Sequence, residues 1–321
     1  MPPGREPIQP DAILKRRYNR RRMTVVGRLA PSPTGALHLG NVRTFLWAWL
    51  SARAQGGRVL LRVEDLDQPR VKPGAVETMI DELRWLGFDW DGEVAVQSAR
   101  RELYRAAHGK LAGRLFSCRC TRGDIAAFQS APHEEDQELR YPGTCRGSTA
   151  SGLAWRFRVE PGRVEFTDRL FGLQSIDVAG TVGDFVAAKT PDQPAYQLAV
   201  VVDDLAQGVT EVVRGDDLLA STARQVILLR ALGHEPPAYG HVPLVVGPDG
   251  RRLAKRHGDA RIASLRERGV PAERIIGILA EGSGLGAGDA TPACLVKKWS
   301  WDRVSRERVV LTPERLAAFG A

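Results

Sequence analysis

The sequence predicts an α/β protein built around a doubly wound parallel sheet. Two observations lead to this prediction. Runs typical of strands, at residues 24–30 and 58–63, alternate with runs typical of helices, at 41–55 and 76–86, and this alternation favours parallel strands joined by helices. The chain has 321 residues, 43% of them hydrophobic, which is enough to bury one large domain or two smaller ones.

The first strand, turn and helix follow from local residue preferences. Residues 24–30 form a short β-branched run that stops at Pro31, and residues 31–35 hold prolines and a glycine that favour a turn. A helix is expected from about Asn41 to Gln55, where Gly56 and Gly57 follow it. Its apolar residues recur at helical spacing, on one face. They are Val42, Phe45, Leu46, Trp49 and Leu50.

A second strand at 58–63 runs into an acidic turn at 64–67, and apolar residues between Val76 and Leu86 predict a further amphipathic helix. Residues 115 to about 150 then interrupt the rhythm and read as an inserted module. Residues 155–159 alternate like a half-exposed strand.

The second half of the chain continues the α/β pattern. Residues 196–202 predict a buried strand with 209–213 as its neighbour, and 242–246 predict another strand before a Gly/Pro turn. Ser221 is expected to cap a helix that ends at Gly233. The remainder is expected to be mainly helical.

Charge and hydropathy narrow the class of protein. The formal net charge of +8 favours polyanionic partners such as nucleic acid, although a basic, solvated surface would give the same balance. No apolar run reaches the length of a membrane span, and the N-terminus lacks the apolar stretch of a secretion signal. We therefore expect a cytoplasmic protein that acts away from membranes, as a monomer.

His38-Leu39-Gly40-Asn41 stands where the predicted turn ends and the helix begins. The free N–H groups of a helix N-terminus attract phosphates, and a glycine lets a phosphate approach the backbone closely. His38 can donate a hydrogen bond to an oxyanion that develops when phosphate is displaced. Taken alone, the four residues also fit an ordinary capping histidine.

A longer match gives these residues a context. Residues 28–41, Arg-Leu-Ala-Pro-Ser-Pro-Thr-Gly-Ala-Leu-His-Leu-Gly-Asn, resemble the signature of glutamyl-type class I aminoacyl-tRNA synthetases. Segments 62–67, 196–204 and 213–218 resemble the same family, so the likeness runs from about residue 25 to 260. It implies a Rossmann-type catalytic domain that activates L-glutamate with ATP, with magnesium on the phosphates. It also implies that ATP is bound by His38, Gly40, Asn41 and Lys255.

Lys255 lies in the segment Arg251-Arg252-Leu253-Ala254-Lys255-Arg256-His257, which resembles the mobile Lys-Met-Ser-Lys-Ser loop of class I synthetases. A lysine there can neutralise the triphosphate as pyrophosphate leaves. Arg252 replaces the first lysine and Ala254 the serine of that pattern, which puts a serine contact to ATP in doubt. Without the family context, the segment is a basic surface loop.

A glutamate substrate carries a second carboxylate, for which a buried arginine is the natural partner. Arg28 and Arg214, at the ends of two predicted strands, are the candidates, since ligands of open sheets bind at the carboxyl ends of strands. Glu64 can bind the ammonium group, and Tyr196 can supply a hydroxyl and a wall. A capping acidic turn and a core aromatic are the alternatives. The resemblance implies that L-glutamate is held by Arg28, Leu29, Ala30, Pro31, Ser32, Glu64, Tyr196 and Arg214.

Three of the four cysteines lie close together in the inserted module: Cys118, Cys120 and Cys145. Three thiolates need a fourth ligand to complete tetrahedral zinc, and Tyr141 or His133 could supply it. Cys-x-Cys followed by Tyr-x-x-x-Cys resembles the zinc site of one subgroup, the glutamyl-Q tRNA(Asp) synthetases, and this resemblance favours Tyr141. Three cysteines without a metal are the alternative.

The acceptor is the remaining question. Fewer than seventy residues follow Lys255, too few for the anticodon-binding body of a full glutamyl-tRNA synthetase. This again resembles the glutamyl-Q subgroup, which implies transfer of glutamate to queuosine in the anticodon of tRNA(Asp). The alternatives are a truncated glutamyl-tRNA synthetase that charges the 3′ adenosine of tRNA(Glu), and a non-catalytic zinc-containing RNA-binding protein.

These readings divide the chain into five segments. We expect a disordered basic arm at 1–22, the first half of the catalytic domain at 23–114, a zinc-bearing insertion at 115–190, the second half with the lysine-bearing loop at 191–258, and a short helical region at 259–321.

Overall fold

The computed structural model describes residues 24–127, 139–147, 152–251, 253, 260–281, 284–286 and 288–319. The predicted basic arm at 1–22, His133 and Lys255 lie outside the described residues.

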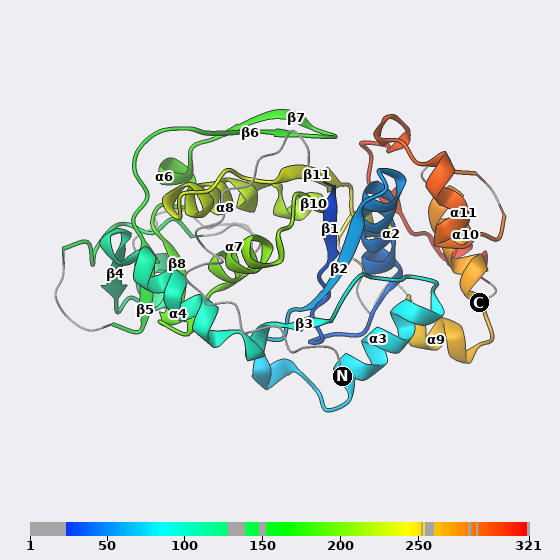
Figure 1. The fold of residues 1–321 in the computed structure, drawn as a ribbon, viewed down its shortest axis with the longest axis horizontal. Helices are drawn as coiled ribbons and strands as arrows, with labels where there is room; N and C mark the ends of the chain where they lie inside the picture. The colour runs from blue at the N-terminus through cyan, green and yellow to red at the C-terminus, as the bar shows by residue number, and fades with distance from the viewer. Residues whose placement is uncertain are drawn as a thin grey trace, which may run out of the picture.

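Two groups of parallel strands form the centre of the fold (Figure 1). In the first group, β1 (Val26–Leu29) pairs with β2 (Arg58–Val63), and β2 pairs with β3 (Ala95–Val96). In the second, β10 (Glu211–Gly215) pairs with β11 (Ala238–Val242). The groups meet between β1 and β10, where Thr210 N donates to Val26 O over 2.9 Å. The chain therefore winds outward in both directions from β1 and β10, and the predicted α/β fold with a parallel sheet is confirmed.

Helices cover both sides of these strands. α2 (Leu39–Ala54) packs on β1 and β10, and Val213 of β10 shares its core. The neighbouring Val212 belongs to a second hydrophobic core. Three helices contribute to that core: α4 (Arg101–Lys110), α7 (Tyr196–Gln207) and α8 (Leu219–Ala231). Successive residues of a strand face opposite sides, so β10 separates the two cores. A further helix, α3 (Ala75–Trp85), comes after β2 in the chain.

The segment after α4 forms an antiparallel sheet of its own and a separate hairpin. The sheet has the order β4 (Leu115–Cys118), β5 (Ala154–Phe157), β8 (Phe185–Thr190), β9 (Gln193–Pro194), and α5 (Arg122–Ala127) follows β4. The hairpin consists of β6 (Val164–Asp168) and β7 (Gly172–Ile176), and α6 (Val178–Thr181) comes after it. Asp168 of β6 pairs in parallel with Tyr239 of β11, so the hairpin extends the central sheet.

Three local predictions were wrong. Residues 196–202 form the first turns of helix α7 instead of a strand, and their apolar side chains are buried around the helix rather than on one stripe. Ser221 lies inside α8, which begins earlier, at Leu219. The strand expected at 242–246 is broken at Pro243, so that β11 ends at Val242 and a short β12 (Val245–Val246) follows.

The C-terminal part is mainly helical, as predicted, and packs against α2. Three indole rings pack together at this contact. The ring centroid of Trp299 lies 5.2 Å from that of Trp47 on α2 and 5.5 Å from that of Trp301. Its elements are α9 (Ile262–Glu267), α10 (Ala272–Glu281), α11 (Pro292–Leu295), β13 (Val309–Val310), which pairs with β12, and α12 (Pro313–Ala317). Among the described residues, no helix is both long and apolar enough to span a membrane.

Short 3-10 helices connect several elements. They are Gln68–Arg70, Gln97–Ala99, Ala112–Arg114, Asp216–Leu218, Val296–Lys298 and Trp301–Arg303.

The contact between the C-terminal part and the sheet predicts a stability difference between two glycines. A Cβ on Gly240 of β11 would lie 2.2 Å from the Trp301 ring, whereas a Cβ on Gly109 of α4 would meet nothing within 4 Å. We expect Gly240→Ala to lower the free energy of unfolding by about 1–3 kcal/mol, because the indole must move. Gly109→Ala should raise it by up to about 0.5–1 kcal/mol, because alanine loses less conformational entropy than glycine in the last turn of α4.

Denaturant unfolding followed by circular dichroism measures both values. A Gly240→Ala protein as stable as the Gly109→Ala control would mean that Trp301 does not pack on β11 as described.

Candidate functional site

The four side chains predicted to bind glutamate lie together at the carboxyl end of the central strands. Arg28 is near the end of β1, Glu64 follows β2 directly, Arg214 is near the end of β10, and Tyr196 opens α7. The charges of Arg28, Glu64 and Arg214 all act on the Tyr196 hydroxyl, and those of Glu64 and Arg214 act on Arg28. The parallel sheet thus brings together residues that are up to 186 positions apart, counted from Arg28 to Arg214.

Arg28 joins the two halves of the sheet. Its Nη1 donates to Val213 O of β10 over 2.9 Å, and its Nε lies 3.7 Å from Asp204 Oδ1. The side chain is only 6% exposed. Burial lowers the pKa of Arg28, and the carboxylate of Asp204 offsets part of that effect.

Arg62, on β2, is the main residue that the sequence analysis left without a role. It is fully buried, and its Nη1 donates to Asp204 Oδ1 over 2.7 Å and to Gln207 Oε1 over 2.9 Å. Its Nη2 and Nε donate to Glu64 Oε1 over 3.1 and 3.3 Å. Burial alone would lower the pKa of Arg62, but Asp204, Glu64 and Asp203 raise it overall. The sequence did hold one signal of this role: a single cation within the apolar run at residues 59–63.

Asp203 anchors the same network from the other side and has no exposed surface. Its carboxylate accepts hydrogen bonds from Gln97 Nε2, Arg100 Nε and Tyr104 Oη, over 2.8, 2.7 and 2.9 Å. Its Oδ2 lies 3.9 Å from Arg62 Nε. The base of the site is therefore a buried, hydrogen-bonded ion network, in which each charge has partners.

Glu64 and Tyr196 present the remaining polar atoms. Glu64 Oε1 accepts both bonds from Arg62, and Glu64 N donates to Pro31 O over 2.9 Å, which ties β2 to the predicted turn. Burial raises the pKa of Glu64, while Arg62 and Arg28 oppose the rise. Tyr196 is 42% exposed, so it is not the core aromatic of the alternative reading. In the preceding segment, Leu29 and Pro31 are buried, Ala30 is half-buried and Ser32 is exposed.

Arg214 is held by neutral partners. Its Nε donates to His241 Nε2 over 3.1 Å, and its Nη2 donates to Thr222 Oγ1 over 2.7 Å. His241 Nδ1 lies 2.7 Å from Asp168 Oδ2, at the end of β6. The sequence analysis missed His241, Thr222 and Asp168.

His38 caps α2 with a reciprocal pair of bonds. Its Nδ1 accepts from Gly40 N over 3.2 Å, and Asn41 Oδ1 accepts from His38 N over 3.3 Å. In a neutral ring with Nδ1 accepting, the proton is on Nε2. A Cβ on Gly40 would lie 3.1 Å from the His38 ring, which explains the glycine there. The cap engages the N–H of Gly40 and fixes the His38 ring at the start of α2, so a phosphate bound here would meet the ring rather than that N–H group.

Both flanks of the predicted lysine-bearing loop contact this helix start. A Cβ on Gly40 would lie 3.7 Å from Leu253 Cδ1, so Leu253 is close to the His38–Asn41 turn. On the other flank, Leu39 N donates to Ala260 O over 3.0 Å. Lys255 itself lies outside the described residues, but the chain on both sides of it is next to His38 and Gly40.

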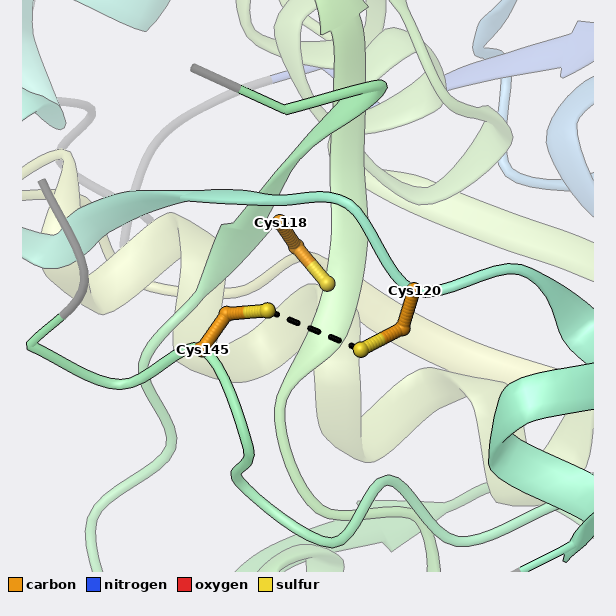
Figure 2. A group of neighbouring side chains, drawn as sticks. All are labelled: Cys118, Cys120 and Cys145. Carbon is orange, nitrogen blue, oxygen red and sulfur yellow. Dashed lines mark hydrogen bonds between the residues drawn. The ribbon is translucent and has the colours of Figure 1, made fainter. Parts of the chain in front are cut away.

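The three clustered cysteines converge, as Figure 2 shows. The Sγ atoms of Cys118, Cys120 and Cys145 all lie within 4.8 Å of one another, and those of Cys120 and Cys145 are 3.5 Å apart. Tyr141 Oη lies 3.5 Å from Cys118 Sγ and accepts from Cys145 N over 2.8 Å. Sulfurs bound to one tetrahedral zinc at about 2.3 Å would have a comparable spacing, so the donor set fits such an ion.

Neighbouring groups favour a thiolate at Cys145, whereas burial and the hydrogen bond with Cys145 raise the pKa of Cys120 to about 11. Arg156 Nε donates to Cys118 Sγ over 3.2 Å, and its guanidinium lies 4.0 Å from the centre of the Tyr141 ring. Burial would raise the pKa of Cys145, but hydrogen bonds from the Arg119 backbone and from the Tyr141 hydroxyl lower it to about 7. Metals bind thiolates rather than thiols, so a lowered pKa suits a metal site.

Comparisons with known proteins show which family the chain resembles. Residues 24–287 match the family of class I tRNA synthetases (E and Q), catalytic domain. The chain is 47% identical to a glutamyl-Q tRNA(Asp) synthetase of Rhodopirellula baltica over 90% of this chain and 97% of that protein. A protein of the same name from Symbiobacterium thermophilum is 46% identical over 91% and 97%. The crystal structure of a glutamate tRNA ligase from Elizabethkingia meningosepticum has a TM-score of 0.79 and 26% identity, covering 92% of this chain and 69% of that one.

The environment of His241 predicts a pH dependence of stability. Burial lowers the pKa of His241 from 6.5, and Arg214 and Arg28 add to this while Asp168 opposes it. The unfolded chain therefore binds a proton that the folded chain excludes, and the free energy of unfolding should fall as the pH drops below about 6.5, by up to about 1.4 kcal/mol per pH unit.

Urea unfolding at several pH values, with wild-type protein and His241→Gln, measures this slope. In the variant, the free energy of unfolding should depend less steeply on pH, because one group that takes up a proton on unfolding is missing. Burial also lowers the pKa of His108, but His108 contributes equally to the slopes of both proteins. Identical slopes would show that His241 takes up its proton in the folded state.

Proposed function

The chain belongs to the glutamyl-Q tRNA(Asp) synthetases, which are class I tRNA synthetases of the E and Q type, and we propose that the clustered arginines and the α2 N-terminus are its substrate site. As a member of this family it is a ligase that attaches glutamate to queuosine in tRNA(Asp). The site then has to bind L-glutamate and ATP side by side. The observation that supports it most directly is the buried Arg214, whose hydrogen-bond partners are uncharged.

Arg214 rather than Arg28 receives the side-chain carboxylate of glutamate in this proposal. Arg28 has Asp204 beside it, whereas Arg214 forms no ion pair with a carboxylate among the described residues. A buried guanidinium without a counter-ion is costly, so a bound carboxylate would stabilise it by charge-assisted hydrogen bonds. Arg28 lies next to Arg214 and adds positive charge for the second carboxylate.

Glu64 and Tyr196 complete the glutamate pocket. Arg62 binds Oε1 of Glu64, which leaves Oε2 to accept from the substrate ammonium group. Tyr196 supplies a hydroxyl and an accessible ring wall. The backbone of residues 29–32 runs beside Glu64, to which Pro31 is hydrogen-bonded, and forms the floor beneath the amino acid.

ATP is placed at the start of α2. Gly40, which has no side chain, lets the phosphates, with their magnesium, come close to the positive end of the α2 dipole, and the Nε2–H of His38 donates to the oxygens at which charge develops. Asn41 helps to fix His38 by accepting a hydrogen bond from its backbone N–H. Lys255, on a loop whose flanks contact this helix start, neutralises the departing pyrophosphate.

The reaction proceeds in two displacements. An oxygen of the glutamate α-carboxylate attacks the α-phosphorus of ATP, forming the adenylate and releasing pyrophosphate. A hydroxyl of the queuosine cyclopentene ring then attacks the acyl carbon, forming the ester and releasing AMP with the hydroxyl proton going to solvent. No protein nucleophile is needed, so positioning and electrostatic stabilisation provide the rate enhancement. We expect the reaction to take place in the cytoplasm.

Cys118, Cys120, Cys145 and Tyr141 would hold a zinc ion. Bound there, zinc would tie β4 to the turn around Tyr141, in a module with a small core of its own. Figure 1 shows β4, which carries Cys118, well away from β1, β10 and α2, and we therefore assign the ion a structural role.

The acceptor assay tests the function. Labelled glutamate, ATP and tRNA(Asp) carrying queuosine are incubated with the enzyme, and the product is digested to nucleosides. We expect the label to leave with the modified anticodon nucleoside, and we expect glutamate-dependent ATP–pyrophosphate exchange. Lys255→Ala should slow this exchange by about 100- to 1000-fold, because a positioned cation acts on the developing charge, while exposed Lys297→Ala serves as the matched control.

Each of the other outcomes would contradict a different part of the proposed function. Label on the 3′ adenosine would identify a conventional glutamyl-tRNA synthetase activity. Absence of exchange with every amino acid would identify a non-catalytic RNA-binding protein. Exchange by Lys255→Ala at the wild-type rate would remove that lysine from the mechanism.

Metal analysis tests the cysteine cluster. Purified wild-type protein should retain zinc through dialysis, and Cys145→Ser should lose it, because one thiolate of the tetrahedral set is missing. Tyr141→Phe should release zinc at a lower chelator concentration than wild type. Exposed Cys294→Ser is the matched control and should keep its zinc.

Zinc retention by Cys145→Ser would contradict the site. Unchanged chelator resistance in Tyr141→Phe would exclude Tyr141 and leave His133 as the fourth ligand to test.

A further inference from the structure

Arg214 is oriented by a chain of buried groups that begins on another part of the fold. Asp168, His241 and Arg214 are hydrogen-bonded in series, and each is at most 5% exposed. Thr222, which has no exposed surface, binds Arg214 from α8. None of these partners has a role in the function proposed above.

The hydrogen bonds determine where the proton of His241 resides. The Nε of an arginine can only donate, so His241 Nε2, 3.1 Å away, must accept from it. The ring proton of a neutral His241 is therefore on Nδ1, where it is donated to Asp168 Oδ2 over 2.7 Å. Burial and the facing cations Arg214 and Arg28 keep this ring neutral, although Asp168 acts in the opposite direction.

Asp168 is itself fixed as an acceptor on both oxygens. Oδ1 accepts from Leu170 N and Phe171 N, over 2.9 and 3.0 Å, and Oδ2 accepts from His241 N over 3.0 Å in addition to the ring. Such a carboxylate has no donor to offer, so it can bind only the Nδ1–H form of His241. The turn after β6 thus selects one tautomer of a residue on β11.

We propose that Asp168 and His241, with Thr222, are positioning residues that orient the Arg214 guanidinium for a glutamate carboxylate without neutralising its charge. This inference rests on the proposed role of Arg214 in glutamate binding. A carboxylate placed directly on Arg214 would orient it equally well, but it would compete with the substrate for the same cation. The imidazole of His241 keeps the negative charge of Asp168 one ring away and presents only a neutral lone pair.

Specificity for glutamate over glutamine follows from this arrangement. With Nε and Nη2 engaged, the remaining N–H groups of Arg214 are fixed donors that a carboxylate can satisfy with two lone-pair-bearing oxygens. An amide offers one oxygen, and its NH₂ group would face another donor. A guanidinium that is free to rotate would lose much of this discrimination.

Thr222 gives the clearest kinetic test, because valine has nearly the shape of threonine without its hydroxyl. We expect Thr222→Val to raise the KM for glutamate by about 10- to 100-fold, because small displacements of a positioning group are costly. The KM for ATP should stay within about twofold, since ATP does not contact this network. Thr222→Ser keeps the acceptor and should behave like wild type in the same ATP–pyrophosphate exchange assay.

His241 provides a second pair of variants. His241→Gln can still offer an oxygen to Arg214 Nε, whereas His241→Leu cannot, so glutamine should restore part of the glutamate affinity that leucine loses. The preference for glutamate over glutamine should fall in the same order. Equal KM values for glutamate in wild type, Thr222→Val and His241→Leu, or a parallel rise in the KM for ATP, would overturn the proposal.

Nitrogen-15 NMR tests the relay without using activity. In protein labelled at histidine, the signal that disappears in His241→Gln should report a protonated Nδ1 and an unprotonated Nε2, the less common neutral tautomer. A protonated Nε2 would overturn the relay even if the enzyme is active. The expected tautomer in a protein without glutamate-dependent exchange would instead leave the relay intact and reject the proposed function.

Discussion

The fully buried guanidinium of Arg62 contacts Glu64, which directly follows its own strand, and Asp203 and Asp204 on α7. Through Asp204 it is linked to Arg28 on β1, and through Asp203 to Arg100 and Tyr104. Without this cation, Glu64 would have no ion-pair partner among the described residues. Asp203 would keep only Arg100, and Asp204 only Arg28. A poorly compensated carboxylate in a low-dielectric interior costs several kcal/mol. The orientation of Glu64, the position of α7 and the environment of Arg28 therefore depend on the same group.

The same network explains why the prediction for residues 196–202 failed. Three successive valines favour a strand by preference, and the helical period is hidden because α7 buries residues all around its axis. Consecutive side chains of a strand point to opposite faces, so a strand could not direct both Asp203 and Asp204 to Arg62. A helix can, and it ends where Gly208 takes a positive φ of 71°. Here a tertiary contact outweighs local preference.

The parts of the site that the sequence revealed share one property: they adjoin regular elements with clear local signals. Arg28, Glu64 and Arg214 stand at strand ends, and His38 stands at a helix start, so the parallel sheet alone predicts that they converge. The cysteines were recognisable from their spacing and their residue type. Asp168 and His241 gave no such signal, because they are 73 positions apart and become neighbours only through the pairing of β6 with β11. Local pattern cannot reveal a register between distant strands.

That pairing gives the segment between the two halves of the sheet a second connection to the site. Its β4–β5–β8 sheet holds the cysteine cluster, while its β6–β7 hairpin reaches back to the central strands. Arg169, just after β6, binds Glu211 of β10 over 2.6 Å, and Glu211 accepts from Ser51 of α2 over 2.5 Å. The hairpin is thus fastened to the same two elements, β10 and α2, that carry Arg214 and the His38 turn. Any shift of the hairpin would move Asp168 relative to Arg214, so the geometry of the proposed amino-acid pocket depends on a segment to which we assign no substrate contact.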